Sequence, residues 1–164
     1  DTGKVDEVIN SFVGDKDTVD AKAVKEAVGQ NRSFSLFEVK NAIMQARTAD
    51  ALAMARQQMQ LFNAAGEVIK LINLLYSSMS NIWQIHYAMR KGMSQQELAQ
   101  QSGMNSWILK RNWQEAQSVS QHALPLIFEA LLDADKAIKG MGVHDPEGIM
   151  YMTIKRIIQA IQKR

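Results

Sequence analysis

The side chains that most often bind metals or perform catalysis are sparse in this sequence. Its three histidines are His86, His122 and His144, and none belongs to an H-x-x-x-H or H-E-x-x-H pair, which would place two imidazoles on one helix face. Cysteine is absent, which removes thiolate catalysis and every Cys-based zinc site. We therefore expect the histidines to be surface or packed residues rather than ligands.

Three carboxylates in the second half of the chain form the best candidate metal-binding group. Glu129 and Asp133 are four residues apart, so a helix would bring them to one face, with Asp135 close by. No histidine and no second acidic cluster accompanies them. A solvated helix face is therefore the preferred interpretation.

Residues 2–5, Thr-Gly-Lys-Val, resemble the end of a phosphate-binding loop. In such a loop a Ser or Thr follows the lysine and holds magnesium, but here the position is Val5, and the upstream glycine is missing. We expect no ATP binding. The sequence predicts no catalytic residue, no metal site and no cofactor, so the chain is not expected to be an enzyme by itself.

Residues 94–111 have the pattern of a helix-turn-helix. Ala99 is small where two helices must approach, Gly103 suits the turn, and Leu109 is a core position. A DNA-binding version would present these residues to the major groove: Asn105, Ser106, Trp107, Lys110 and Arg111. Because the bulky tryptophan is atypical of base-reading positions, we prefer a two-helix packing corner within a bundle. A helix-turn-helix DNA-binding regulator is the alternative.

A long apolar helix is predicted from just after Gly66 to about Arg90. Its apolar residues cover far more than the stripe of about 100° that a surface helix needs. Such a helix is either central to a bundle or also part of a subunit interface, and both can hold together. The candidate interface residues are its large aromatic side chains: Tyr76, Trp83 and Tyr87.

Helical periodicity punctuated by glycine runs through the whole sequence, without a convincing strand period. We predict an all-α protein with about nine helices. A polar segment near residues 29–34 separates two short helices from the rest, and two helices are too few for a domain. Residues 1–30 are therefore predicted to end a preceding domain, and residues 31–164 to form a helical bundle.

Charge is distributed unevenly along the 164 residues. Residues 1–30 carry seven acids and four bases, whereas residues 31–164 carry ten acids and fifteen bases. This mild basic excess is compatible with contacts to DNA or to an acidic partner protein, and it favours neither of the two. The candidate contacts are four basic residues: Lys110, Arg111, Lys155 and Arg156.

The longest apolar stretch, Val68 to Tyr87, is interrupted by a lysine and several Asn and Ser residues, so we do not expect it to span a membrane. Neither an initiator methionine nor a signal-peptide pattern is present at Asp1. We expect a soluble cytoplasmic protein without membrane contacts, cut from a longer chain. Its 46% apolar content is sufficient for a core without disulfides.

Five segments also carry a family resemblance, and their order and spacing are more specific than any one of them. They are residues 13–29, 34–43, 48–59, 97–110 and 131–139, the last reading Leu-Leu-Asp-Ala-Asp-Lys-Ala-Ile-Lys. In this order they resemble the C-terminal part of the delta subunit of bacterial DNA polymerase III, which belongs to the clamp loader. The first segment is similar to the end of that family's small lid domain, and the other four to helices of its collar domain.

The resemblance implies a helical bundle of the clamp-loader collar type, preceded by a two-helix remnant of an AAA-type lid domain. It implies a role in assembly, because the collar joins delta to the delta-prime and tau or gamma subunits. The whole complex loads the sliding clamp onto DNA in replication, as part of a DNA-directed DNA polymerase holoenzyme, a nucleotidyltransferase. The clamp would be gripped through an N-terminal domain outside this chain, DNA contact would come through the assembled complex, and delta is not expected to hydrolyse ATP.

Overall fold

The computed structural model describes residues 36–140 and 145–163. These ranges contain seven helices and no strand, which confirms the all-α prediction; the two helices expected before residue 30 lie outside them. The first described helix covers residues 36–44. The other six are α3 (Thr48–Leu61), α4 (Ala64–Arg90), α5 (Gln95–Ser102), α6 (Ser106–Ser118), α7 (Ala123–Ile138) and α8 (Pro146–Gln162).

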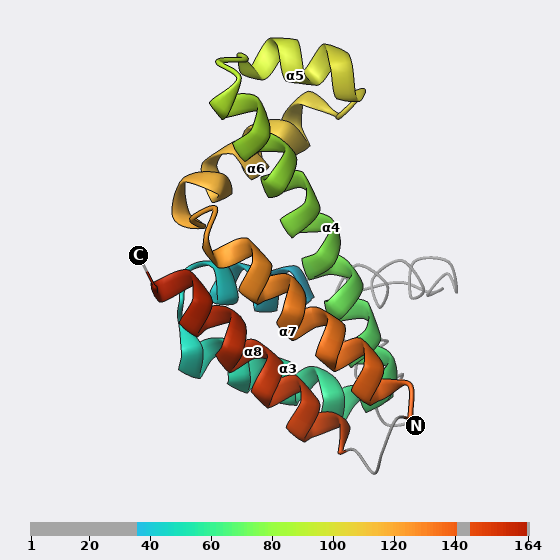
Figure 1. Cartoon of the computed structure of the whole chain (residues 1–164). Coiled ribbons are helices and arrows are strands. Elements are labelled where there is room, and N and C mark those ends of the chain that lie inside the picture. Colours follow the sequence, from blue (N-terminus) through green and yellow to red (C-terminus); the bar gives the residue numbers. More distant parts are fainter. Residues whose placement is uncertain (1–35, 141–144, 164) are drawn as a thin grey trace, which may run out of the picture. The chain divides into compact units, whose positions relative to one another are not determined.

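The chain divides into the units Asp1–Phe37 and Glu38–Arg164, and α4 is the central helix of the second unit (Figure 1). It contacts α3, α6, α7 and α8. One side of α4 is buried over most of its length, and Leu75, Ile82 and Ile85 are fully enclosed. The central burial that the apolar pattern predicted is confirmed.

The start of α4 differs from the prediction. The helix begins at Ala64, and Gly66 lies inside its first turn. The cause is Asn63, whose side-chain oxygen accepts a hydrogen bond of 2.8 Å from the Gly66 backbone N–H. An Asn at the N-cap satisfies one of the backbone donors that a helix start leaves unpaired, so it fixes the boundary ahead of the glycine.

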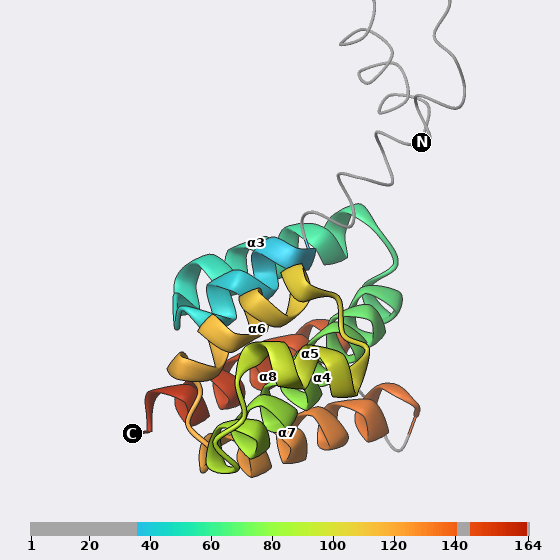
Figure 2. The ribbon, with the colours of Figure 1, turned by 90° about the horizontal axis from the view of Figure 1, so that it is seen from above.

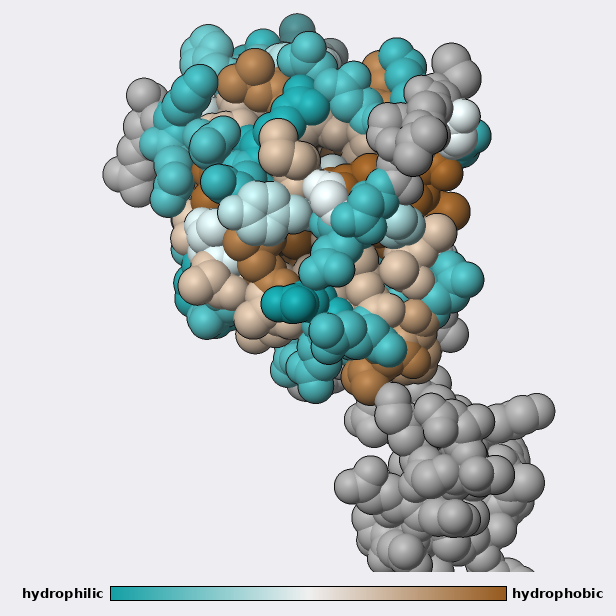
Figure 3. All heavy atoms as spheres, turned by 90° about the horizontal axis from the view of Figure 1, so that it is seen from below, coloured by the Kyte–Doolittle hydropathy of each residue, from teal (hydrophilic) through white to brown (hydrophobic). Residues whose placement is uncertain are grey.

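α7 and α8 pack against each other, and α3 packs on α8 and α4 (Figure 2). α8 begins at a side-chain cap: the Asp145 carboxylate accepts hydrogen bonds from the backbone N–H groups of Glu147 and Gly148. Pro146 occupies the first helical position, where its missing N–H has no consequence. At the opposite end of the unit from α5, apolar side chains are interspersed with hydrophilic ones (Figure 3).

α5 and α6 form the helix-turn-helix that residues 94–111 predict. Ser94 and Glu97 cap α5 reciprocally, and the hydrogen bonds from Ser94 hold the pKa of the Glu97 carboxyl below its ordinary value. Gly103 makes the turn with a φ of 65°, a left-handed conformation that favours glycine. α6 packs on α4, and its buried residues include Leu109 and Ala116. The motif therefore serves as a packing corner of the bundle.

Candidate subunit interface

An exposed apolar face extends over α4 and onto α7. On α4, Ile69, Tyr76 and Trp83 recur every seven residues, which places them on one side of the helix. Their exposed fractions are 42%, 57% and 51%, and Leu132 on α7 is 52% exposed. We call this surface the α4–α7 face; its residues are Ile69, Tyr76, Trp83, Phe128 and Leu132.

Phe128 fixes the aromatic residues of the α4–α7 face in place. Its ring centroid lies 5.8 Å from that of Tyr76, in an edge-to-face arrangement, and 6.1 Å from that of Trp83. Such contacts between aromatic rings are favourable beyond the area that they bury. Because the rings are already held against one another, they would lose less side-chain freedom on binding a partner than isolated side chains would.

The α4–α7 face is hollowed between its two helices. A groove of about 580 Å³ lies there, and its apolar walls include Tyr76, Phe128 and Leu132. Its margin is polar, with an ion pair of 2.7 Å between Asp135 and Lys139. An apolar centre with a charged rim is the usual composition of a protein–protein interface.

The three aromatic residues predicted from the sequence as interface residues are all exposed. Tyr76 and Trp83 lie within the α4–α7 face, and Tyr87, 50% exposed, continues the line one turn further along α4. The sequence prediction missed Phe128 and Leu132, because α7 is apolar on several sides and its periodicity does not identify the exposed one. Their role in an interface stays a prediction.

A mostly buried polar network joins the first described helix to α4 and α6. Lys40 Nζ lies 3.1 Å from Glu115 Oε2, with side chains only 5% and 14% exposed. The Ser78 hydroxyl donates to the same carboxylate oxygen, and Arg111 Nε lies 3.5 Å from the other. Arg111 also donates to Asn41 Oδ1 at 2.7 Å. Burial lowers the pKa of Lys40, while the negative charge of Glu115 opposes this shift.

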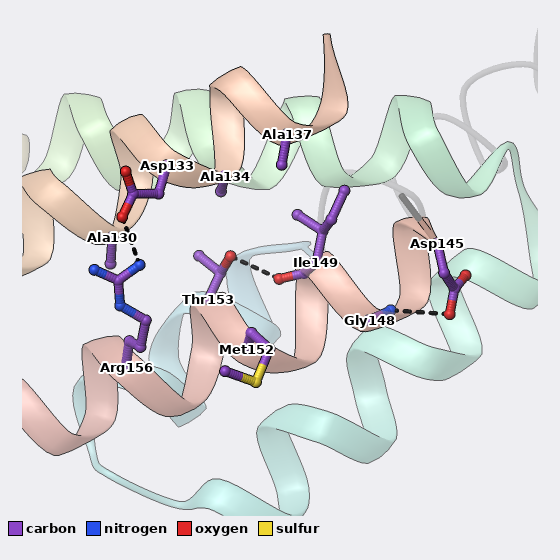
Figure 4. Close-up of a pocket in the computed structure, with 10 residues that line it drawn as sticks. All are labelled: Ala130, Asp133, Ala134, Ala137, Asp145, Gly148, Ile149, Met152, Thr153 and Arg156. Atoms are coloured by element: carbon purple, nitrogen blue, oxygen red, sulfur yellow. Dashed lines mark hydrogen bonds and ion pairs between the residues drawn. The ribbon is translucent and has the colours of Figure 1, made fainter. Parts of the chain in front are cut away.

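The four basic residues predicted as DNA or acidic-partner contacts belong to two helices and do not form one cluster. Lys110 is exposed on α6, whereas its neighbour Arg111 is held by the polar network just described. On α8, Arg156 pairs with Asp133 at 2.8 Å (Figure 4), and Lys155 Nζ lies 5.2 Å from the centroid of the Tyr151 ring. As contacts for DNA or a partner, all four stay predictions.

In the groove between α7 and α8, the carboxylates form an ion pair and a helix cap. Asp133 and Arg156 lie at one end of its lining, and Asp145 caps the start of α8 at the other (Figure 4). Small side chains, including Ala134, line the space between them. Asp135 is paired with a lysine, so two of the three candidate metal-binding carboxylates have cationic partners.

The histidines and carboxylates do not gather into a metal site in the part of the chain that the structure describes. Residues 36–140 and 145–163 contain no group of three or more His, Cys, Asp or Glu side chains that could hold an ion. His86 on α4 is half-buried, and its Nε2 lies 2.7 Å from the carbonyl oxygen of Val119, the residue after α6; His122 is exposed, and His144 lies outside these ranges. Nor does any helix in these ranges have the length and apolarity needed to cross a membrane.

Comparison with known proteins gives consistent matches. The family model of the DNA polymerase III delta subunit, C-terminal domain, matches residues 33–157. DNA polymerase III subunit delta of Bacillus subtilis (strain 168) is 23% identical over 153 residues, which are 93% of this chain and 43% of that protein. The solved structure of the Bacillus subtilis DNA clamp loader delta protein matches with a TM-score of 0.67 and 21% identity, over 96% of this chain and 45% of that one. The chain thus spans less than half the length of these relatives.

Proposed function

Because the chain belongs to the family formed by the C-terminal domains of DNA polymerase III delta subunits, we propose that it is the assembly region of a clamp-loader delta subunit. Residues 31–164 act as the collar, and residues 1–30 end the preceding lid domain. The collar holds delta against the delta-prime and tau or gamma subunits, in a cytoplasmic complex that loads the sliding clamp onto DNA. The clamp is bound through parts of the delta protein outside this chain.

The α4–α7 face is the observation that carries this proposal. It combines exposed aromatic and aliphatic residues from two helices, including Trp83 and Tyr76, which are 51% and 57% exposed. Contiguous apolar surface of this kind marks interaction sites, and Trp and Tyr are the residues that most often dominate binding energy. Burial of this face against another subunit would supply the driving force for association.

The assembly role assigns no catalysis to this chain. Asp133, Asp135 and Glu115 are paired with cationic side chains, which suits structural rather than catalytic use of these carboxylates. The chain contributes to the DNA-directed DNA polymerase holoenzyme as a structural part, and ATP hydrolysis belongs to other subunits.

The alternative, a DNA-binding regulator that uses residues 94–111, has less support. Asn105 uses its side-chain oxygen to cap α6, by accepting a hydrogen bond of 2.9 Å from the Trp107 backbone N–H. α6 buries Leu109 and Asn112 within the bundle. The family match extends far beyond the helix-turn-helix and favours assembly.

Co-purification with loader subunits tests the proposal and its domain boundary together. We expect the 164-residue chain and a version limited to residues 31–164 to bind the delta-prime and tau or gamma subunits of the same organism equally well, because the α4–α7 face lies within both. Binding that requires residues 1–30 would contradict the domain assignment. Absence of binding by both chains, each shown to be folded by circular dichroism, would contradict the assembly role.

A further inference from the structure

The first described helix, residues 36–44, is joined to α3 through a strained residue, Ala46. Its φ is 54°, and among the described residues no other non-glycine residue has a positive φ. A side chain has a steric cost in this left-handed conformation, which glycine avoids. Two backbone hydrogen bonds end the helix in this conformation. The Ala46 N–H donates to the Ile43 carbonyl at 3.0 Å, and the next N–H donates to the Ala42 carbonyl at 2.9 Å.

The joint formed by residues 45–47 is held by local contacts. Arg47 Nε donates to the Gln45 side-chain oxygen at 2.9 Å, and Arg47 Nη1 lies 2.6 Å from Asp50 Oδ2. Within the described ranges, the hydrogen bonds and ion pairs of this joint reach only helix 36–44 and the first turn of α3. The backbone angles of such a joint can change without breaking contacts elsewhere in the bundle.

Buried contacts hold helix 36–44 against α4 and α6. Lys40 is 4% exposed and lies 3.1 Å from Glu115 on α6, whose carboxylate also accepts from Ser78 on α4. Asn41 accepts a hydrogen bond of 2.7 Å from Arg111. The apolar side of the helix is fully buried as well: Val39, Ala42 and Ile43. Docking therefore depends on apolar burial and on a polar network that is costly to break.

Helix 36–44 also contains the boundary between the two units of the chain, which falls between Phe37 and Glu38. We propose that this helix is a hinged strap, which undocks from α4 and α6 as one body by a change of backbone angles at Ala46 while α3–α8 stay folded. The strain at Ala46 favours release, whereas the contacts of Lys40 oppose it, so the undocked form is a minor state. Undocking changes the direction in which the chain enters the bundle and leaves the α4–α7 face intact, so this device is additional to assembly.

Native-state hydrogen exchange, followed by NMR on the 164-residue chain, tests the proposal. After correction for intrinsic rates, the protected amides of helix 36–44 should exchange at least about tenfold faster than the slowest amides of α7. A helix that opens only when the whole unit unfolds would show the same protection as α7, and that result would overturn the proposal.

Two substitutions should shift the undocking equilibrium in opposite directions. Lys40→Met should accelerate exchange in helix 36–44 by about a hundredfold, as expected when a buried ion pair loses one partner. Ala46→Gly should slow this exchange by about threefold to fivefold, because glycine removes the steric cost of the docked conformation. Unchanged or faster exchange in Ala46→Gly would contradict a hinge at this residue.

Ile127→Val is the control, because it weakens the bundle at a distance from the strap. Ile127 is fully buried on α7, which lies on the opposite side of the unit from helix 36–44 (Figure 2). Loss of a buried methyl group should accelerate exchange of the slowest α7 amides by roughly fivefold. Exchange in helix 36–44 should not change, because the strap opens while α7 stays folded; equal acceleration in both would overturn the proposal. These measurements need no loader subunit, so their outcome is independent of the assembly test.

Discussion

Replacing Lys40 by methionine should lower the free energy of unfolding by about 3 kcal/mol. This value lies at the lower end of the range for breaking a buried ion pair, because Glu115 would keep Arg111 and Ser78 as weaker partners. Methionine retains much of the length of lysine, so the loss reports mainly the missing charge. Thermal unfolding followed by circular dichroism should show a melting temperature lower by roughly 6–12 °C.

Lys139→Met is the matched control for this substitution. Lys139 also forms a carboxylate pair, at 2.7 Å from Asp135, but its side chain is 67% exposed. Removal of an exposed pair should cost less than about 1 kcal/mol. The double variant Lys40→Met with Glu115→Gln should be more stable than Lys40→Met alone. In the double variant the carboxylate charge at position 115 is removed together with its lysine partner, so no unpaired charge stays buried. Equal losses from Lys40→Met and Lys139→Met would contradict the importance of the buried network.

Trp83→Ala should weaken binding to the other loader subunits by about thirtyfold or more, which corresponds to about 2 kcal/mol. Trp83 has the largest side chain of the α4–α7 face, and its ring centroid lies 6.1 Å from that of Phe128. Because half of the side chain is exposed in the free chain, the substitution should change the melting temperature little. The affinity is measured by titrating the labelled 164-residue chain with purified loader subunits.

Met152→Ala is the control for the interface. Met152 is 58% exposed on α8 and lies outside the α4–α7 face, so its loss removes a similar kind of apolar surface from another part of the unit. We expect its affinity for loader subunits to equal that of the unchanged chain. If Met152→Ala and Trp83→Ala weaken binding equally, the α4–α7 face is not the dominant contact.

The helices of the described unit could be predicted from the sequence because their signals are local. Ser94 and Glu97 identify the start of α5, and Asp145 with Pro146 identifies the start of α8. The start of α4 was predicted wrongly because glycine was taken as the boundary, whereas Asn63 forms the cap three residues earlier. Local capping chemistry was thus sufficient at the starts of α5 and α8.

Tertiary partners could not be predicted in the same way. Lys40 looks like an exposed residue of an amphipathic helix, and its burial depends on a carboxylate 75 positions further along the chain, Glu115. Arg111 appeared available for DNA, but its guanidinium is engaged by Glu115 and Asn41. From the sequence, Tyr76 and Trp83 could have been either buried in the bundle or exposed at an interface. The periodicity of an apolar central helix does not show which of its sides lacks a neighbouring helix.

Labelling of a single cysteine on the α4–α7 face tests the assembly role most directly. The chain contains no cysteine, so each introduced thiol is unique. Ser80→Cys places a thiol between Tyr76 and Trp83, on the same side of α4, and Ser118→Cys places one at the exposed end of α6 as the control. Maleimide labelling rates are compared for the free chain and for the chain saturated with loader subunits.

Assembly through the α4–α7 face predicts that loader subunits strongly slow the labelling of Ser80→Cys and leave that of Ser118→Cys unchanged. Labelling of Ser80→Cys at the same rate in the free and the assembled chain would contradict it.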